Sequence, residues 1–194
     1  MKNINNLSRF ISLILRHKPE VINIKLDKHG YANVEELING INNNKKYTID
    51  FDLLKQIVDT DDKKRYSFNE DFTKIRANQG HSIDVDVELK ECKPPKNLYH
   101  GSSGKYFDSI IDKGIISKSR LYVHLSKDYD TAYTVGSRHG RPIVFIIDSE
   151  RMYKDGYKFY LSENNVWLTK HVPKEYINIM INKELMLIHD KFIK

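Results

Sequence analysis

The sequence has little of several features that define common classes of protein. It contains one cysteine, Cys92, so neither an internal disulfide nor a CxxC metal pair can form. No apolar run approaches the ~20 residues needed to cross a bilayer. Residues 1–20 are amphipathic and lack the uninterrupted apolar segment of a secretory signal. These absences argue against a disulfide scaffold and a membrane protein, and we expect a cytoplasmic protein.

Signatures of familiar catalytic sites are missing as well. The chain has no GxGxxG, no GxxxxGK[ST] and no HExxH motif, and its 8 histidines do not follow metal-ligand spacing. We therefore expect no metal site. The 194 residues suffice for one large domain or two small ones, and the net charge of +6 suits a polyanionic partner. Because lysine is abundant throughout, the placement of the arginines carries more information than the total charge.

The first half of the chain predicts helices with recognisable ends. Apolar residues at helical spacing indicate an amphipathic helix over about 7–17, which Pro19 ends. Asn33 has the position of a helix cap, with Glu36 as its capping-box partner and Gly40 as the C-terminal stop. A third helix, capped by Thr48 or Asp50, is expected to bury its apolar residues, namely Phe51, Leu54, Ile57 and Val58.

A predicted β-hairpin follows these helices. Arg65–Phe68 and Thr73–Arg76 read as its strands, and helices followed by a hairpin are the order of a winged-helix unit. Such units bind nucleic acid in many proteins and only protein partners in others. Ile83–Leu89 alternates polar and apolar residues, which predicts a further strand.

The double proline at Pro94 and Pro95 is the expected boundary between domains 1–93 and 94–194. The second domain reads as β-rich. Short strands are expected near residues 97–101, 121–125, 142–148, 159–161, 166–168 and 176–181, with helices at 102–113 and from a Ser126 cap through 133. The fold class is therefore α+β.

Polar clusters at the ends of these elements are the candidate functional residues. The most concentrated is Lys74–Ser82, where a strand with Arg76 runs into two amides, a glycine, a histidine and a serine. Backbone N–H groups, amides and a guanidinium in one loop can hold an anion, and paired arginines bind a phosphate monoester bidentately. Each cluster alone also has a purely structural explanation. Arg16 and His17, for example, are favourable cations at a helix C-terminus.

Seven segments, taken together and in order, strongly resemble the NAD-dependent RNA (tRNA) 2′-phosphotransferase family. They are Leu15–Pro19, Leu26–Ala32, Ile75–Ser82, Leu98–Gly101, Val123–Ser126, Gly136–Gly140 and Phe159–Leu168. The resemblance implies a winged-helix N-terminal lobe that binds RNA and a C-terminal lobe with the ADP-ribosyltransferase fold that binds NAD. We also expect a monomer that needs no metal and no membrane.

The resemblance implies a reaction in two steps. An internal RNA 2′-monophosphate attacks C1″ of NAD⁺ and nicotinamide leaves. The ribose O2″ then attacks phosphorus, which releases RNA with a 2′-OH and ADP-ribose 1″,2″-cyclic phosphate. The implied RNA substrate is a tRNA splice junction in eukaryotic members of the family.

The resemblance also assigns roles to residues. The catalytic group would be Arg16, His17, Arg76 and Arg138, with arginines from both lobes holding one phosphate. The residues expected to line the NAD pocket are His100, Gly101, Ser102, His124, Leu125 and Ser126. Those expected to bind RNA or phosphate are Asn78, Gln79, Gly80, His81 and Ser82.

Three positions depart from the family pattern, and three other functions are open. Phe72 and Asn165 stand where glycine is usual, and Ser102 replaces threonine; none of these changes removes a catalytic side chain. A protein mono-ADP-ribosyltransferase would require a glutamate where Val166 stands. A winged-helix regulator without catalysis would leave the polar clusters of the second half unexplained, and an inactive or ADP-ribose-binding relative would not need the complete arginine set.

Overall fold

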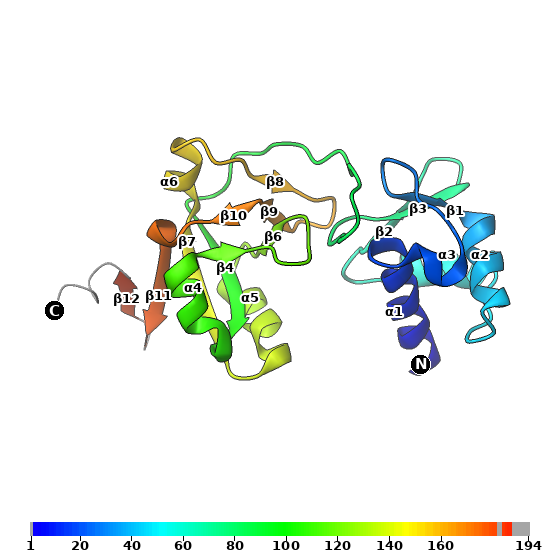
Figure 1. Ribbon diagram of the computed structural model, residues 1–194, viewed down its shortest axis with the longest axis horizontal. Helices are drawn as coiled ribbons and strands as arrows, with labels where there is room; N and C mark the ends of the chain where they lie inside the picture. The colour runs from blue at the N-terminus through cyan, green and yellow to red at the C-terminus, as the bar shows by residue number, and fades with distance from the viewer. Residues whose placement is uncertain (1, 182–183, 188–194) are drawn as a thin grey trace. The chain divides into compact units, whose positions relative to one another are not determined.

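The computed structural model describes residues 2–181 and 184–187. The chain combines helices with several small antiparallel sheets, which confirms the α+β class (Figure 1). It divides into two compact units, Met1–Leu89 (unit 1) and Lys90–Lys194 (unit 2).

Unit 1 is built from helices around a small sheet. Its elements are α1 (Lys2–Arg16), the 3-10 helix η1 (Pro19–Ile22), β1 (Tyr31–Asn33), α2 (Val34–Asn43), α3 (Phe51–Asp59), β2 (Tyr66–Phe68) and β3 (Lys74–Ala77). The strands lie in the order β1-β3-β2, so β3 is central and pairs antiparallel with both neighbours. The core of the unit includes Ile11, Ile14, Leu37, Leu54 and Ile75, each of which has no exposed surface.

Unit 2 contains more strands. Its helices are η2 (Gly104–Tyr106), α4 (Phe107–Lys113), α5 (Tyr129–Gly136), η3 (Ser137–His139), α6 (Ser149–Lys154) and η4 (Lys174–Tyr176). Its strands are β4 (Asn97–Ser103), β5 (Ile115–Ile116), β6 (Val123–Leu125), β7 (Pro142–Asp148), β8 (Tyr160–Leu161), β9 (Trp167–Thr169), β10 (His171–Val172), β11 (Ile177–Ile181) and β12 (Glu184–Leu187).

The largest sheet of unit 2 has the order β12-β11-β7-β4, and α5 packs on β4 and β7 (Figure 1). Strand β7 is an uninterrupted apolar run because it is covered on both sides; Phe145 and Ile147 are fully buried. A second sheet, β6-β9-β8, meets the first where Tyr99 and Ser126 exchange backbone hydrogen bonds of 2.9 and 2.7 Å. This junction brings the ends of β4 and β6 together.

Several helix ends agree with the sequence. The side chain of Asn33 accepts a hydrogen bond from the backbone N–H of Glu36, and Asp50 caps α3 in the same way. The prediction that Gly40 ends α2 was wrong. The helix continues to Asn43. Glycine is needed at position 40 because Ile22 packs against it, and a Cβ there would lie 2.9 Å from the Ile22 carbonyl oxygen.

The prediction of a buried Phe51 was also wrong. This ring is 39% exposed and lies 6.0 Å from the ring of Phe68 and 6.4 Å from that of Phe72. Phe72 occupies the hairpin turn with φ +60, a conformation that favours glycine. The three phenylalanine rings pack against one another at the surface, and the helical periodicity of the sequence does not predict this contact.

Ile83–Leu89 forms no strand, contrary to prediction. The alternation is real, since Val85 and Val87 pack 3.6 Å from the position that a Cβ of Gly30 would take. The backbone, however, has no partner strand: Asp86 N–H bonds the Lys28 carbonyl, and Glu88 has φ +56. An alternating pattern indicates which side chains face the core, whether or not the backbone pairs with a neighbouring strand.

Two element boundaries in unit 2 were wrong as well. The helix expected at 102–113 starts later, because Ser102 and Ser103 extend β4 by pairing with Ile143 and Pro142. The cap of α5 is Asp128 rather than Ser126; its carboxylate accepts from Thr131 N–H at 2.8 Å. Ser126 is instead held in the junction with Tyr99.

Candidate functional site

The end of α1 and the loop after β3 lie together in unit 1. His17 Nδ1 is 2.9 Å from the Ser82 hydroxyl, and Ser82 N–H donates to the Arg16 carbonyl at 3.0 Å. Gly80, with φ +89, lies against Arg16: a Cβ on Gly80 would be 3.5 Å from Arg16 Nη1. Two segments far apart in sequence, 16–17 and 80–82, therefore form one site.

The ionisable groups of this site are buried. The exposed fractions of Arg16, Arg76 and His81 are 9%, 8% and 3%. Burial, together with the nearby positive charges of Arg16, His17 and Arg76, lowers the pKa of His81 to about 4. His81 is therefore neutral at pH 7, and its Nε2 is buried without a hydrogen-bond partner in the described part of the chain.

Arg76 owes its position to the centre of the small sheet. It pairs with Tyr31 on one side and Ser67 on the other, and its guanidinium carbon lies 4.7 Å from the centre of the Tyr31 ring. A carboxylate oxygen of Glu88 lies 3.6 Å from Arg76 Nη1. Grouping cations in a buried place is unfavourable unless an anion joins them, so this arrangement suits an anionic ligand.

The other polar residues of the loop differ in what they do. The Asn78 side chain accepts from the Ser67 hydroxyl and donates to the Lys64 carbonyl at 2.8 Å, so its amide closes the hairpin. Gln79 is partly buried beside it. Within the predicted group Asn78–Ser82, Asn78 therefore has a structural role. Gly80, His81 and Ser82 adjoin the site formed around Arg16 and Arg76, called the arginine site below.

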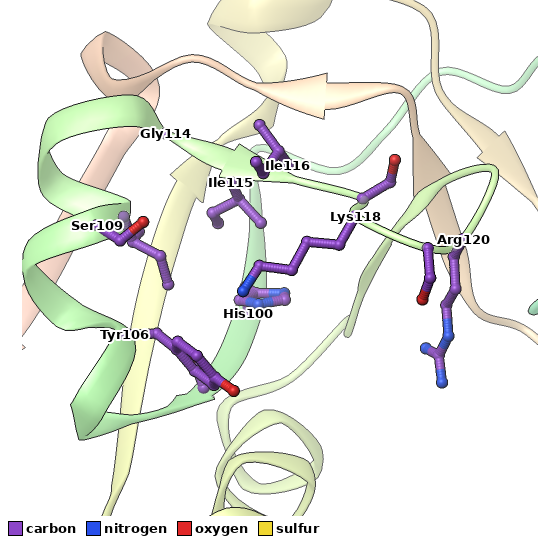
Figure 2. A pocket seen from close by; sticks show the side chains of 12 residues that line it. His100, Tyr106, Ser109, Gly114, Ile115, Ile116, Lys118 and Arg120 are labelled. Atoms are coloured by element: carbon purple, nitrogen blue, oxygen red, sulfur yellow. The ribbon is translucent and has the colours of Figure 1, made fainter.

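Unit 2 contains a pocket of about 300 Å³ beside β4. Figure 2 shows His100 below Lys118, with Tyr106 and Ser109 on the side of α4 and Arg120 at the far end of the loop. The lining residues are His100, Ser102, Tyr106, Ser109, Ile110 and the segment 114–120. Apolar walls with a few polar and charged groups are typical of a pocket for a small ligand, and the volume is at the lower end of such pockets.

Of the residues predicted for the second half, His100 and Ser102 line this pocket. His100 Nδ1 lies 3.0 Å from the His124 carbonyl, which can only accept, so Nδ1 carries the proton. Burial lowers the pKa of His100, although this hydrogen bond acts in the opposite direction. The neutral ring therefore keeps Nε2 as an acceptor for a ligand hydroxyl.

Gly101 and Leu125 have packing roles in the structure. A Cβ on Gly101 would lie 1.7 Å from the Ala132 carbonyl oxygen, so only glycine allows α5 to approach β4. Leu125 is 2% exposed and belongs to the core of unit 2. Both residues hold the elements that carry His100, His124 and Arg138.

Arg120 lies in the pocket wall and was not predicted. Its Nη1 is 3.5 Å from His124 Nδ1, and partial burial followed by the positive charge of Arg138 lowers its pKa. The structure thus brings together Arg120, His124 and the predicted Arg138. A lone arginine between strands gives little signal in sequence. Tyr31 and Glu88, which contact Arg76, were missed because one reads as a strand residue and the other as part of an alternating pattern.

No group of three or more histidine, cysteine, aspartate or glutamate side chains in residues 2–181 and 184–187 could hold a metal ion. Within those same residues, no helix is long and apolar enough to span a membrane.

Buried arginines and a histidine in one unit, and a pocket with cations in its wall in the other, are features of proteins that bind anionic ligands such as phosphates. The comparisons specify the family. A model described as "RNA 2'-phosphotransferase, Tpt1 / KptA family" matches residues 2–171. The chain belongs to this family, whose members are transferases of phosphorus-containing groups, and the predicted membership and enzyme class are confirmed.

Curated relatives carry the same description. A protein of Fusobacterium nucleatum named "Probable RNA 2'-phosphotransferase" is 58% identical over 178 residues, covering 91% of this chain and 99% of the relative. Proteins with the same name from Flavobacterium johnsoniae and Nostoc punctiforme are 53% and 47% identical. They cover 89% and 88% of this chain, and 94% of each relative is matched.

Proposed function

We propose that this protein removes an internal RNA 2′-monophosphate by transferring it to NAD⁺. The products are RNA with a 2′-OH, nicotinamide and ADP-ribose 1″,2″-cyclic phosphate. The observation that carries the proposal is the burial of Arg16 and Arg76, at 9% and 8% exposure, around a neutral His81. Guanidinium groups keep their charge at any working pH and can hold a phosphate in a fixed orientation.

The pocket of unit 2 supports NAD⁺ as the second substrate. Tyr106 and isoleucines offer surfaces for a base, His100 Nε2 can accept from a ribose hydroxyl, and Arg120 can bind phosphate oxygens. We propose Arg138, whose charge acts on Arg120, as the catalytic arginine of this unit. The pocket volume of about 300 Å³ is enough for part of a dinucleotide. Family membership independently supports an RNA that carries the phosphate.

The residues have distinct tasks in the proposed reaction. Arginine clamps place a phosphate oxygen for attack on C1″ and balance the negative charge that grows on the phosphoryl oxygens in the second step. The RNA 2′-oxygen must gain a proton when it leaves. We assign this proton to His17, whose ring is oriented by the 2.9 Å contact between Nδ1 and the Ser82 hydroxyl.

We further propose that unit 1 is the winged-helix, RNA-binding lobe and unit 2 the ADP-ribosyltransferase-like, NAD-binding lobe, acting as a monomer in the cytoplasm. The succession of α1, α2 and α3 before the β2–β3 hairpin supports the first assignment. The pocket beside β4 supports the second.

The test is incubation with a short RNA that bears one internal 2′-phosphate, with and without NAD⁺. We expect loss of the 2′-phosphate only with NAD⁺, together with nicotinamide release. NAD⁺ consumption with modification of protein rather than RNA would favour a protein mono-ADP-ribosyltransferase instead. RNA binding without any phosphate removal would favour a non-catalytic regulator.

The role of His17 has its own test. His17→Ala should accumulate RNA carrying ADP-ribose on its 2′-phosphate, because the second step lacks its acid. Denaturing gel electrophoresis of 5′-labelled RNA resolves this species. Turnover at the wild-type rate without that species would show that His17 is not the acid.

A further inference from the structure

The segment that follows the arginine site is fastened to the turn before β1. Asp86 N–H donates to the Lys28 carbonyl at 2.9 Å, and His29 Nδ1 lies 3.0 Å from the Asp86 carbonyl. On the apolar side, Val85 and Val87 face Gly30. These contacts fix the backbone on both sides of the position from which Glu88 projects.

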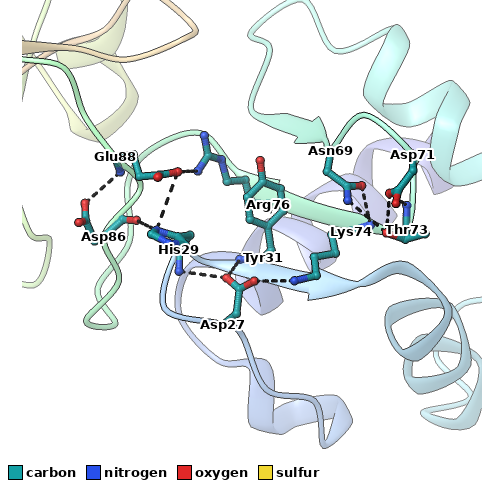
Figure 3. Close-up of polar contacts among 10 residues, drawn as sticks. All are labelled: Asp27, His29, Tyr31, Asn69, Asp71, Thr73, Lys74, Arg76, Asp86 and Glu88. Carbon is teal, nitrogen blue, oxygen red and sulfur yellow. Dashed lines mark hydrogen bonds and ion pairs between the residues drawn. The ribbon is translucent and has the colours of Figure 1, made fainter.

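Glu88 has an unusual backbone and a defined contact. Its φ of +56 turns the chain out of the extended course that the sequence predicts, and its N–H donates to an Asp86 carboxylate oxygen at 2.9 Å. Figure 3 shows the result: the Glu88 carboxylate lies between Arg76 and His29, 3.6 Å from Arg76 Nη1 and 3.8 Å from His29 Nδ1. A carboxylate thus stands at one of the two buried guanidiniums.

The position of this acid bears on a selectivity problem in the proposed reaction. Every nucleotide of an RNA carries a phosphodiester with one negative charge, whereas a 2′-monophosphate carries about −1.5 to −2 at pH 7. Arginines alone attract both. Specificity in such cases depends on a repulsive group that the correct ligand overcomes and the wrong ligand does not.

We propose that the Glu88 carboxylate determines the specificity of the protein for RNA that carries a 2′-monophosphate. It interacts with Arg76 strongly enough to compete with RNA phosphodiesters, and a 2′-monophosphate displaces it. The inference rests on the proposed function, since it presumes that Arg76 holds the substrate phosphate. The Glu88 side chain is 59% exposed and can swing into solvent when a stronger anion arrives. Arg76 keeps its place meanwhile, because β1, β2 and the Tyr31 ring hold it.

The test compares two RNAs of one sequence, one with and one without a single internal 2′-phosphate. Fluorescence anisotropy measures their affinities for the full chain, without NAD⁺, for the wild type and for Glu88→Gln. An exposed ion pair contributes at most about a few-fold in affinity, so we expect Glu88→Gln to bind the unmodified RNA about threefold more tightly. Binding of the 2′-phosphorylated RNA should change less. The ratio of the affinity for 2′-phosphorylated RNA to the affinity for unmodified RNA should therefore fall.

Asp84→Asn is the matched control. Asp84 is exposed in the same segment and makes no hydrogen bond or ion pair within the described residues, so its loss removes the same charge without freeing Arg76. The affinities of this variant for both RNAs should rise by the same factor, so their ratio should stay at the wild-type value. Glu88→Asp, with a shorter reach toward Arg76, should lie between Glu88→Gln and the wild type.

An unchanged ratio in Glu88→Gln, or weaker binding of both RNAs, would overturn the inference; the second result would make Glu88 a positioning residue for Arg76. Circular dichroism and thermal unfolding confirm that each variant is folded. The proposed function is judged separately, by 2′-phosphate removal in wild type with NAD⁺. Absence of that activity would refute the function, whatever the affinity ratio shows.

Discussion

The two units handle charge in opposite ways. In unit 1 the cations are interior: Arg16 and Arg76 are less than a tenth exposed, and their surroundings are a strand centre, an aromatic ring and a glycine turn. In unit 2 the cations that line the pocket, Lys118 and Arg120, lie on a loop and are partly exposed. Buried arginines are fixed in place before a ligand binds, whereas exposed ones can adjust to it.

This difference corresponds to the ligands that we assign. A single phosphate is small and has one shape, so a rigid set of donors can orient it without losing side-chain entropy on binding. A dinucleotide is long and flexible, and exposed lysine and arginine side chains can follow it. Substitutions in unit 1 should therefore mainly affect the rate, and substitutions of the exposed cations in unit 2 should mainly affect affinity.

The sharpest test of this contrast is Arg16→Lys. Lysine retains the charge but not the planar pair of donors, and in a rigid site it cannot shift to compensate. We expect 2′-phosphate removal to slow at least about hundredfold, since misplacement by about 1 Å costs that much. Single-turnover kinetics with saturating RNA and NAD⁺ measure this rate.

Arg9→Lys is the matched control for that variant, because Arg9 is exposed on the same helix, α1. It should keep the wild-type rate. Near-normal turnover in Arg16→Lys would show that unit 1 needs only positive charge, and the contrast between the units would disappear.

The second prediction concerns how unit 2 supports its pocket. In Gly101→Ala the new Cβ would lie 1.7 Å from the Ala132 carbonyl oxygen, so α5 must move off β4. We expect a loss of about 2–3 kcal/mol in the free energy of unfolding, at the upper end for overpacking. Chemical denaturation measures it.

Gly104→Ala is the corresponding control in unit 2. The nearest atom to a Cβ at Gly104 would be the Arg141 carbonyl oxygen at 3.5 Å, an ordinary contact, so stability should hardly change. Equal losses in both variants would show that α5 is not fixed by Gly101.

Much of this architecture could be predicted from local chemistry. The caps at Asn33 and Asp50, the hairpin strands and the apolar strand β7 depend on neighbours in sequence, and the structure has them. The predictions failed where the role of a residue depends on a segment that is distant in sequence. Gly40 is glycine because of Ile22, and Ile83–Leu89 alternates without a partner strand. Arg120 joins the site only through its closeness to His124 and Arg138.

The third prediction concerns the interior character of the unit 1 site. His81, with a pKa of about 4, should remain neutral at pH 5.5, whereas an unperturbed histidine is mostly protonated there. The unfolded chain binds this proton at about 6.5, so stability from His81 is complete above that pH and is lost as pH falls from 6.5 toward 4. Imidazole NMR titration, assigned with His81→Gln, measures the value.

Urea unfolding at pH 7 and pH 5 provides an independent readout for His81. The His81→Gln variant should lose less stability than wild type between these two values. A His81 that titrates near 6.5, or equal losses in both proteins, would show that the site is open to water. Unit 1 would then resemble unit 2.

The smallest expected effect lies in unit 2 and uses the missed residue. Arg120→Gln removes the guanidinium in the pocket wall but leaves the neighbouring Arg138 in place, so we expect only about a fivefold loss of affinity for ADP-ribose, which is about 1 kcal/mol and in the range of one ordinary hydrogen bond. Isothermal titration calorimetry with ADP-ribose and with adenosine separates phosphate from base contacts: adenosine should bind as in wild type. Because an exposed cation acts mainly through affinity, the single-turnover rate at saturating NAD⁺ should remain within about twofold of wild type. A rate loss comparable to that of Arg16→Lys would mean that Arg120, despite its exposure, positions reacting atoms, and the division between a rigid unit 1 and an adaptable unit 2 would be wrong.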